Sequence, residues 1–268
     1  MSVPFELRGA AVVVTGAGSG IGRAAALAFA ARGARVAVSD VDGDRAARTA
    51  TDIVTAGGEA TSMRVDVAES KDLEQLRDHC LERFGRVDVV MNNVGVLAMG
   101  PPESLPIEAW RRVLDLNLLG IARSNLVFLP LLLEQGSGHV VNTSSASGLL
   151  AYGFDRLPYV ASKHAVVGVS EALALYLGPK GIGVTCLCPS GVVTNIAEQI
   201  SFFGAASSSP RAPQHPVVEP EQVGELVAEA VTHGRFLVVT APEVHDELRE
   251  RAADPEAYIQ RMIAEQRA

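Results

Sequence analysis

Short apolar runs alternate along the chain with longer stretches of helical periodicity. Most of these runs are apolar at consecutive positions rather than at every second one. Strands that are apolar on both faces, each followed by a helix, are typical of a parallel sheet covered by helices on both sides. The pattern predicts a single α/β domain over residues 1–268. Its seven strands are expected at residues 10–15, 34–39, 61–67, 87–92, 138–144, 183–188 and 235–240.

Two segments depart from this alternation. Residues 195–220 hold a Phe–Phe pair, a serine run and four prolines, and they predict a long loop. Loops of this length within a compact domain are commonly functional. We therefore expect a substrate lid, with a plain surface insertion as the alternative. Residues 242–268 are charged and helical in pattern, and they predict a helical tail.

Composition excludes several classes of protein. A formal net charge of -8 argues against a general nucleic-acid binder, which would normally present a basic face. No apolar run reaches the roughly 18 residues of a membrane span, and the first residues lack the pattern of a signal peptide. We expect a cytoplasmic protein that has neither a nucleic-acid partner nor a membrane attachment.

The cysteines and histidines give no pattern of metal ligands. Three cysteines cannot all pair within one chain, and Cys186 and Cys188 alternate along a predicted strand. We expect these two thiols to pack in the core of a reduced protein rather than to bind metal. His139 and His164 have no carboxylate or cysteine at ligand spacing, and we expect both to be structural or surface residues.

Glycines lie between the first predicted strand and the first predicted helix, at Gly16, Gly20 and Gly22. Such a loop lets the backbone approach a pyrophosphate at the helix N-terminus. Asp40 ends the next strand, where a carboxylate accepts hydrogen bonds from ribose hydroxyls and repels a 2′-phosphate. Ser19 places no cation near that position. The pattern predicts a dinucleotide site that prefers NAD to NADP.

Two tyrosines are each followed four residues later by a basic residue, Tyr152 by Arg156 and Tyr159 by Lys163. Pro158 suits the first turn of a helix, so Tyr159 and Lys163 are expected one turn apart on one face. A nearby cation lowers the pKa of a phenol and makes it a candidate for proton transfer. Tyr152 precedes that helix, and we expect it to line a pocket or pack under the loop.

Five segments resemble, in the same order, the motifs of the short-chain dehydrogenase/reductase family in its compact, non-extended branch. They are TGAGSGIG (15–22), NNVG (92–95), SSASG (144–148), YVASK (159–163) and PSGVVT (189–194). The resemblance covers roughly residues 8–240 and implies a doubly wound Rossmann fold and hydride transfer between a nicotinamide cofactor and an alcohol or ketone. Val94 and Ser190 depart from the family pattern, which implies a slightly altered backbone near the nicotinamide.

The resemblance also implies roles for individual residues. Tyr159 would exchange the proton of the substrate alcohol, and Ser145 would hydrogen-bond its oxygen, with Ser144 and Ser147 as competitors for that role. Lys163 would bond the nicotinamide ribose, and Asn117 would hold a water that links the lysine to solvent. The implied cofactor-binding residues are Gly16, Ser19, Gly20, Ile21, Gly22, Asp40, Asp66, Val67, Asn93, Gly95, Tyr159, Lys163, Val192 and Thr194.

The implied substrate pocket is largely apolar and contains no obvious cationic clamp. It predicts a hydrophobic secondary alcohol or ketone as the small-molecule substrate. Two alternatives stay open, an NADP-dependent carbonyl reductase and a catalytically silent nucleotide-binding homologue. Family members commonly pair the helices expected around 108–133 and 159–178, which implies a homodimer or homotetramer. The implied pocket residues are Val96, Leu97, Ser147, Leu149, Phe154, Leu157, Phe202 and Phe203.

Overall fold

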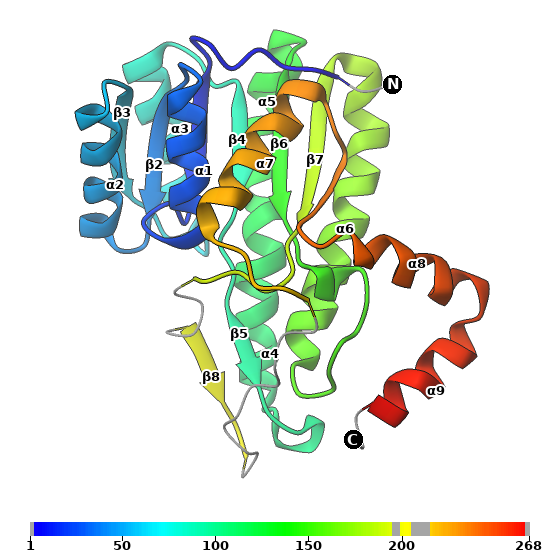
Figure 1. Ribbon diagram of the computed structural model, residues 1–268. Helices are drawn as coiled ribbons and strands as arrows, with labels where there is room; N and C mark the ends of the chain where they lie inside the picture. The colour runs from blue at the N-terminus through cyan, green and yellow to red at the C-terminus, as the bar shows by residue number, and fades with distance from the viewer. Residues whose placement is uncertain (1–2, 195–198, 205–214, 266–268) are drawn as a thin grey trace.

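The computed structural model describes residues 3–194, 199–204 and 215–265 (Figure 1). Its strands are β1 (Ala11–Thr15), β2 (Arg35–Asp40), β3 (Glu59–Arg64), β4 (Val89–Asn92), β5 (Leu97–Met99), β6 (Gly138–Thr143), β7 (Ile182–Cys188), β8 (Ile200–Phe202) and β9 (Leu237–Val239). Seven of them form one parallel sheet in the order β3-β2-β1-β4-β6-β7-β9. The chain thus winds outward from β1 in both directions, and the predicted doubly wound fold is confirmed.

Helices cover both faces of this sheet (Figure 1). They are α1 (Gly20–Ala31), α2 (Gly43–Thr55), α3 (Ser70–Phe84), α4 (Ile107–Leu114), α5 (Gly120–Gln135), α6 (Leu157–Leu177), α7 (Pro220–His233), α8 (Glu243–Ala253) and α9 (Pro255–Glu265). In β1, Val12 and Val14 pack toward α1 and α7, whereas Val13 packs toward α3 and α5. Both layers exclude solvent, which explains why the strands are apolar at consecutive positions.

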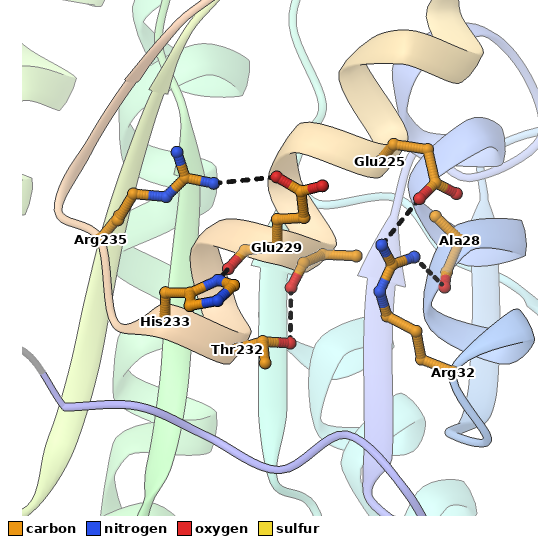
Figure 2. A network of polar contacts seen from close by, with 8 residues as sticks. Ala28, Arg32, Glu225, Glu229, Thr232, His233 and Arg235 are labelled. Atoms are coloured by element: carbon orange, nitrogen blue, oxygen red, sulfur yellow. Dashed lines mark hydrogen bonds and ion pairs between the residues drawn. The ribbon is translucent and has the colours of Figure 1, made fainter.

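Close backbone packing joins α7 to α1. A Cβ atom at Gly224 would lie 2.6 Å from the backbone of Ala24, so only glycine permits this approach. At the solvent edge, Arg32 donates to Glu225 over 2.7 Å (Figure 2). Exposed ion pairs of this kind contribute about 0–1 kcal/mol. The buried contact between the helices therefore holds them together more than the ion pair does.

The segment 195–220 differs from its prediction as a loop. Ile200–Phe202 forms β8, which pairs in parallel with β5 in a small second sheet. Val192 also forms a bridge with Val218. The prediction is wrong for β8 because three residues are too few to show strand periodicity. The rest of the predicted lid lies partly outside the described residues, at 195–198 and 205–214.

The apolar stretch around 108–133 is one helical segment whose middle turn is irregular. A π-helical turn at Asp115–Leu119 joins α4 to α5. Together, Ile107–Gln135 is long and apolar enough to cross a membrane by length and composition alone, a test that core helices also pass. Val127 and Phe128 of α5 pack with α3 against the sheet, which is the position of a core helix.

The C-terminal helices α8 and α9 cap their own subunit. Tyr258 and Met262 of α9 are buried in an apolar cluster with Leu149 and Leu150, which follow β6. Arg251 of α8 donates to the carbonyl of Leu149 over 2.6 Å. The tail is therefore bound to the loop that precedes α6.

Candidate active site

The loop between β1 and α1 is shaped by glycines. Gly16 and Gly20 have φ values of 63° and 51°, a region that side-chain-bearing residues rarely adopt. A Cβ at Gly16 would lie 3.1 Å from Val94, and one at Gly20 would lie 3.1 Å from Thr194. The loop thus leaves the N-terminus of α1 open to the cavity, as an anionic pyrophosphate requires.

Gly22 serves packing rather than contact with a ligand, since it does not line the cavity. A Cβ at Gly22 would lie 2.2 Å from the carbonyl oxygen of Gly16 and 2.5 Å from the side-chain Nδ2 atom of Asn93. Neither distance is tolerable, so a side chain here would move α1 away from the loop. This is the close helix–strand packing for which such a glycine is needed.

Gly22→Ala is therefore expected to destabilise the protein by about 1–3 kcal/mol, because overpacking forces the backbone to shift. Chemical denaturation measures this change. Gly178→Ala is the matched control, because a Cβ at Gly178 meets nothing within 4 Å and its φ of -54° suits alanine. That change restricts the unfolded chain, so it should stabilise the protein by about 0.4–1 kcal/mol. Equal effects of the two substitutions would contradict the packing role of Gly22.

Asp40 ends β2 beside the glycine loop and lines the cavity. Its Oδ2 accepts a hydrogen bond from the Gly18 N–H at 2.9 Å, and its Oδ1 accepts one from the Asp42 N–H at 3.0 Å. These bonds fix a carboxylate where ribose hydroxyls would bind. A smaller hollow adjoins the loop and is lined by Gly18, Ser19, Gly20, Arg23, Arg45 and Arg48.

Ser145, Tyr159 and Lys163 line the same cavity. Ser145 lies two residues after the end of β6, whereas the other two lie on the first turns of α6, one turn apart as predicted. Helix α6 begins at Leu157, with Pro158 in its first turn. The Nζ atom of Lys163 donates to the carbonyl of Thr143 over 2.8 Å and lies 5.6 Å from the centroid of the Tyr159 ring.

The pKa values of these groups reflect burial. Burial raises the pKa of the Tyr159 phenol, and a hydrogen bond from Ser145 opposes that rise. Burial lowers the pKa of the Lys163 ammonium to about 8. The lysine thus remains mostly cationic at neutral pH. Further positive charge near the phenol would lower its pKa.

Asn117 lies in the π-helical turn and is fully buried. Its Oδ1 accepts from the Val96 N–H at 2.8 Å, and its Nδ2 donates to the Val96 carbonyl and to Ser162 Oγ, both at 3.0 Å. Asn117 thereby connects the segment between β4 and β5 to the helix that carries Tyr159 and Lys163. It is not among the residues that line the cavity.

The competing serines have different surroundings. Ser144 is buried, and its hydroxyl donates to the carbonyl of Lys163 over 2.7 Å. Ser147 lines the cavity, and its N–H donates to Ser145 Oγ over 3.1 Å. Ser144 thus fixes the position of α6, while Ser145 faces Tyr159.

The cavity has a volume of about 930 Å³ and brings together every residue implied for the cofactor except Gly22. It brings together fewer of those implied for the substrate. Val96, Leu97 and Ser147 line it, but Leu149, Phe154, Leu157, Phe202 and Phe203 do not. Leu149 is buried with α9, and Leu157 and Phe203 pack on the cluster around α4. Phe154 and Phe202 are exposed.

Several polar residues also line the cavity, although the sequence did not single them out as site residues. They are Arg112, Asp115, Arg156, Gln199, His215 and Glu265. Tyr152, for which the sequence left two roles open, lines the cavity as well. The cavity wall is therefore more polar than predicted. The sequence holds one signal of these polar side chains, which is the position of Tyr152 in the loop between the SSASG and YVASK motifs.

The histidines and the paired cysteines of the sequence analysis occupy structural positions. His139 is fully buried and bonds Thr185 over 2.8 Å, and burial lowers its pKa to about 3. His164 is bonded to the backbone carbonyl of Val160. Cys186 and Cys188 are free thiols buried in β7. These residues lie in the places that core and helix packing require.

Comparisons with known proteins show the family to which the chain is related. The family model of the short chain dehydrogenases matches residues 10–202. A cyclohexanol dehydrogenase of Acinetobacter sp. (strain SE19) is 36% identical, covering 81% of this chain and 85% of that one. A meso-2,3-butanediol dehydrogenase of Serratia marcescens is 35% identical, with the same two shares.

A solved structure is similar along nearly the whole chain. It is a short chain dehydrogenase/reductase from Burkholderia phymatum in complex with NAD, 34% identical, with a TM-score of 0.84. The match covers 94% of this chain and 96% of that one. The family model, the relatives and this structure agree, and the chain belongs to the short-chain dehydrogenase family.

Proposed function

We propose that the protein is an NAD-dependent oxidoreductase that transfers hydride between the cofactor and a secondary alcohol or ketone. The observation that carries this proposal is one continuous cavity. At one place it is lined by the glycine loop and Asp40, and at another by Ser145, Tyr159 and Lys163. Its volume of about 930 Å³ lies at the upper end of known ligand pockets.

When bound, NAD supplies the carbon that accepts or returns hydride. The ionised Tyr159 phenolate takes the proton of the alcohol during oxidation, and the resulting phenol returns that proton during reduction of the ketone. The Ser145 hydroxyl donates a hydrogen bond to the substrate oxygen and holds it beside the phenol. Lys163 holds its ammonium 5.6 Å from the centroid of the Tyr159 ring, and a positive charge near a phenol favours its ionised form. The hydrogen bond from Ser145 and the charge of Arg156 oppose the rise in the pKa of Tyr159 that burial causes.

Asp40 supports NAD as the cofactor, and the Burkholderia relative was solved with NAD. The hollow lined by Arg23, Arg45 and Arg48 supports the NADP alternative, because arginine is well suited to phosphate. Two of these arginines already have carboxylate partners, Arg23 with Asp52 at 2.9 Å and Arg45 with Asp42 at 3.3 Å. We therefore place NAD first.

The proposed substrate is a secondary alcohol or ketone with a largely apolar body. Val94, Val96, Leu97 and Leu116 give the cavity an apolar wall close to the reacting groups. The related enzymes named above act on cyclohexanol and on meso-2,3-butanediol. Both are small secondary alcohols, as the proposal requires.

Initial rates of cofactor reduction test the function. The purified protein is offered NAD or NADP with a panel of cyclic and linear secondary alcohols, and with primary alcohols of the same size as controls. We expect turnover of secondary alcohols and a higher kcat/KM with NAD. Tight NADH binding with no turnover of any member would instead favour the catalytically silent alternative.

We also propose that subunits pair through α5 and α6. Leu126 and Leu175, on these helices, are 79% and 80% exposed, and an interface between the helices that family members commonly pair would cover such side chains. Changing both to Glu should give a single chain of 28.1 kDa by light scattering. Val54→Glu on α2 is the control and should leave the mass unchanged. A wild-type monomer would contradict this assembly.

The proposed location is the cytoplasm. Cys80, Cys186 and Cys188 are free and buried, and free thiols are usual where the compartment is reducing.

A further inference from the structure

Three polar side chains meet at the cavity wall, and the proposed reaction uses none of them. His215 Nε2 lies 3.2 Å from the Tyr152 hydroxyl and 3.3 Å from Glu247 Oε1. The rings of Tyr152 and His215 meet edge to face with their centroids 5.5 Å apart. The loop before α6, the chain before α7 and helix α8 therefore converge on one polar point, and Tyr152 and His215 line the cavity there.

This polar point is set among apolar side chains. His215 is buried, and Tyr152 packs with Leu149 and Leu150 and with residues of α8 and α9. Burial, the hydrogen bond to Glu247 and the nearby Tyr258 all raise the pKa of Tyr152. Its phenol therefore stays neutral, and a neutral phenol both donates and accepts hydrogen bonds. Tyr152 is suited to binding rather than to proton transfer.

The position of Tyr152 in the chain relates it to the substrate. Its loop begins beside Ser145 and ends at α6, which carries Tyr159. Both ends of the loop thus hold groups that meet the reacting oxygen, and all three residues line one cavity. A hydrocarbon placed against Tyr152 and His215 would desolvate these polar groups without offering them a hydrogen bond. A substrate hydroxyl at the same place would donate to the phenol oxygen, which still accepts a hydrogen bond when its own O–H bonds Glu247.

We propose that Tyr152 hydrogen-bonds a second oxygen of the substrate, so that the enzyme selects diols and hydroxyketones over hydrocarbon alcohols of the same shape. This inference rests on the oxidoreductase function proposed above. Tyr152 contacts the substrate, while His215 and Glu247 are positioning residues that orient the phenol. The inference adds a polar contact to the largely apolar pocket expected from the sequence.

A matched pair of alcohols tests the inference. Cyclohexanol and 1,2-cyclohexanediol differ by one hydroxyl, and the ratio of their kcat/KM values is measured in each variant. Comparing that ratio between variants cancels the intrinsic reactivity of the two alcohols. We expect the wild type to prefer the diol and Tyr152→Phe to lower the ratio about 10-fold, as loss of one hydrogen bond predicts. The change should fall on KM, because this hydroxyl takes no part in the chemical step.

Changes at the positioning residue give a second readout. Glu247→Gln keeps an acceptor for the Tyr152 hydroxyl and should keep most of the preference, whereas Glu247→Ala should reduce it. Tyr258→Phe is the matched control. It removes a buried hydroxyl that has no hydrogen-bond partner among the described residues, and Tyr258 does not line the cavity. In Tyr258→Phe, the ratio of kcat/KM for the diol over cyclohexanol should stay within about twofold of the wild-type ratio.

The possible outcomes separate the two proposals. Turnover with an unchanged ratio in Tyr152→Phe overturns the role of Tyr152, as does a wild type that prefers cyclohexanol. Absence of turnover with both alcohols in the wild type overturns the oxidoreductase function on which the inference rests.

Discussion

Tyr159→Phe is expected to lower kcat for alcohol oxidation by about 10²–10⁴-fold, the usual contribution of a general acid–base group. Phenylalanine keeps the ring that packs at the start of α6 but removes the only atom of this residue that can exchange a proton. Lys163 still donates to the carbonyl of Thr143, so the position of the lysine in the site is retained. Steady-state rates measure the loss, and a fluorescence titration with NADH measures cofactor binding, which should be nearly unchanged.

The control for this substitution lies on the same helix. Tyr176→Phe makes the identical chemical change near the end of α6, at an exposed residue outside the cavity. It should leave kcat within about twofold of the wild type. Near-normal kcat in Tyr159→Phe would contradict the assignment of this residue as the proton-transfer group.

Asp40→Ser is expected to shift the ratio of kcat/KM for NADP over NAD by about 10²-fold toward NADP. The substitution removes a carboxylate that repels a 2′-phosphate, and it removes acceptors for the ribose hydroxyls. Hydrogen bonds to charged groups contribute about 1.5–3 kcal/mol, which accounts for a change of this size. Arg45 lies close to the Asp40 carboxylate, since a Cβ atom at Gly18 would lie 2.6 Å from Arg45 and 2.8 Å from Asp40.

Asp44→Ser is the control for the change in charge. Asp44 is an exposed acid on the first turn of α2 and does not line the cavity. Its substitution removes the same net charge and should leave the cofactor ratio within about twofold of the wild type. Equal shifts in the two variants would mean that general electrostatics, rather than contact at Asp40, sets the preference.

Much of the fold was predictable because the strands are buried on both faces. Val12, Val13 and Val14 are all buried, so β1 is a continuous apolar run that is visible without any neighbour. The glycine loop was predictable for a similar reason. Gly16 and Gly20 adopt backbone conformations that other residues avoid, and that requirement appears directly in the sequence.

The predictions that failed depend on contacts between distant segments. Strands β5 and β8 have three residues each and are defined by their pairing rather than by a pattern. The π-helical turn places Asn117 in hydrogen bonds with Val96 and Ser162, which lie 21 and 45 residues away in the chain. His215 meets Tyr152 across 63 residues of sequence, a contact that no local periodicity reports.

The substrate pocket was the least predictable part of the site for the same reason. Phe202 and Phe203 are adjacent in the chain, yet one is exposed and the other packs beside α4. Leu149 is turned toward α9, whose position no motif indicates. The direction in which a loop side chain points depends on the C-terminal helices that cover the loop. The apolar character of these residues therefore did not show which of them line the pocket.

The most direct test of the central claim follows the hydride itself. Cyclohexanol that carries deuterium on its carbinol carbon is incubated with the protein and NAD, and the product NADH is examined by mass spectrometry and NMR. Hydride transfer predicts one deuterium at the reactive carbon of the nicotinamide ring for each NADH formed, and at least about 10²-fold slower formation of this labelled NADH when Tyr159→Phe replaces the wild type. NADH formed without deuterium would contradict direct transfer between alcohol and cofactor.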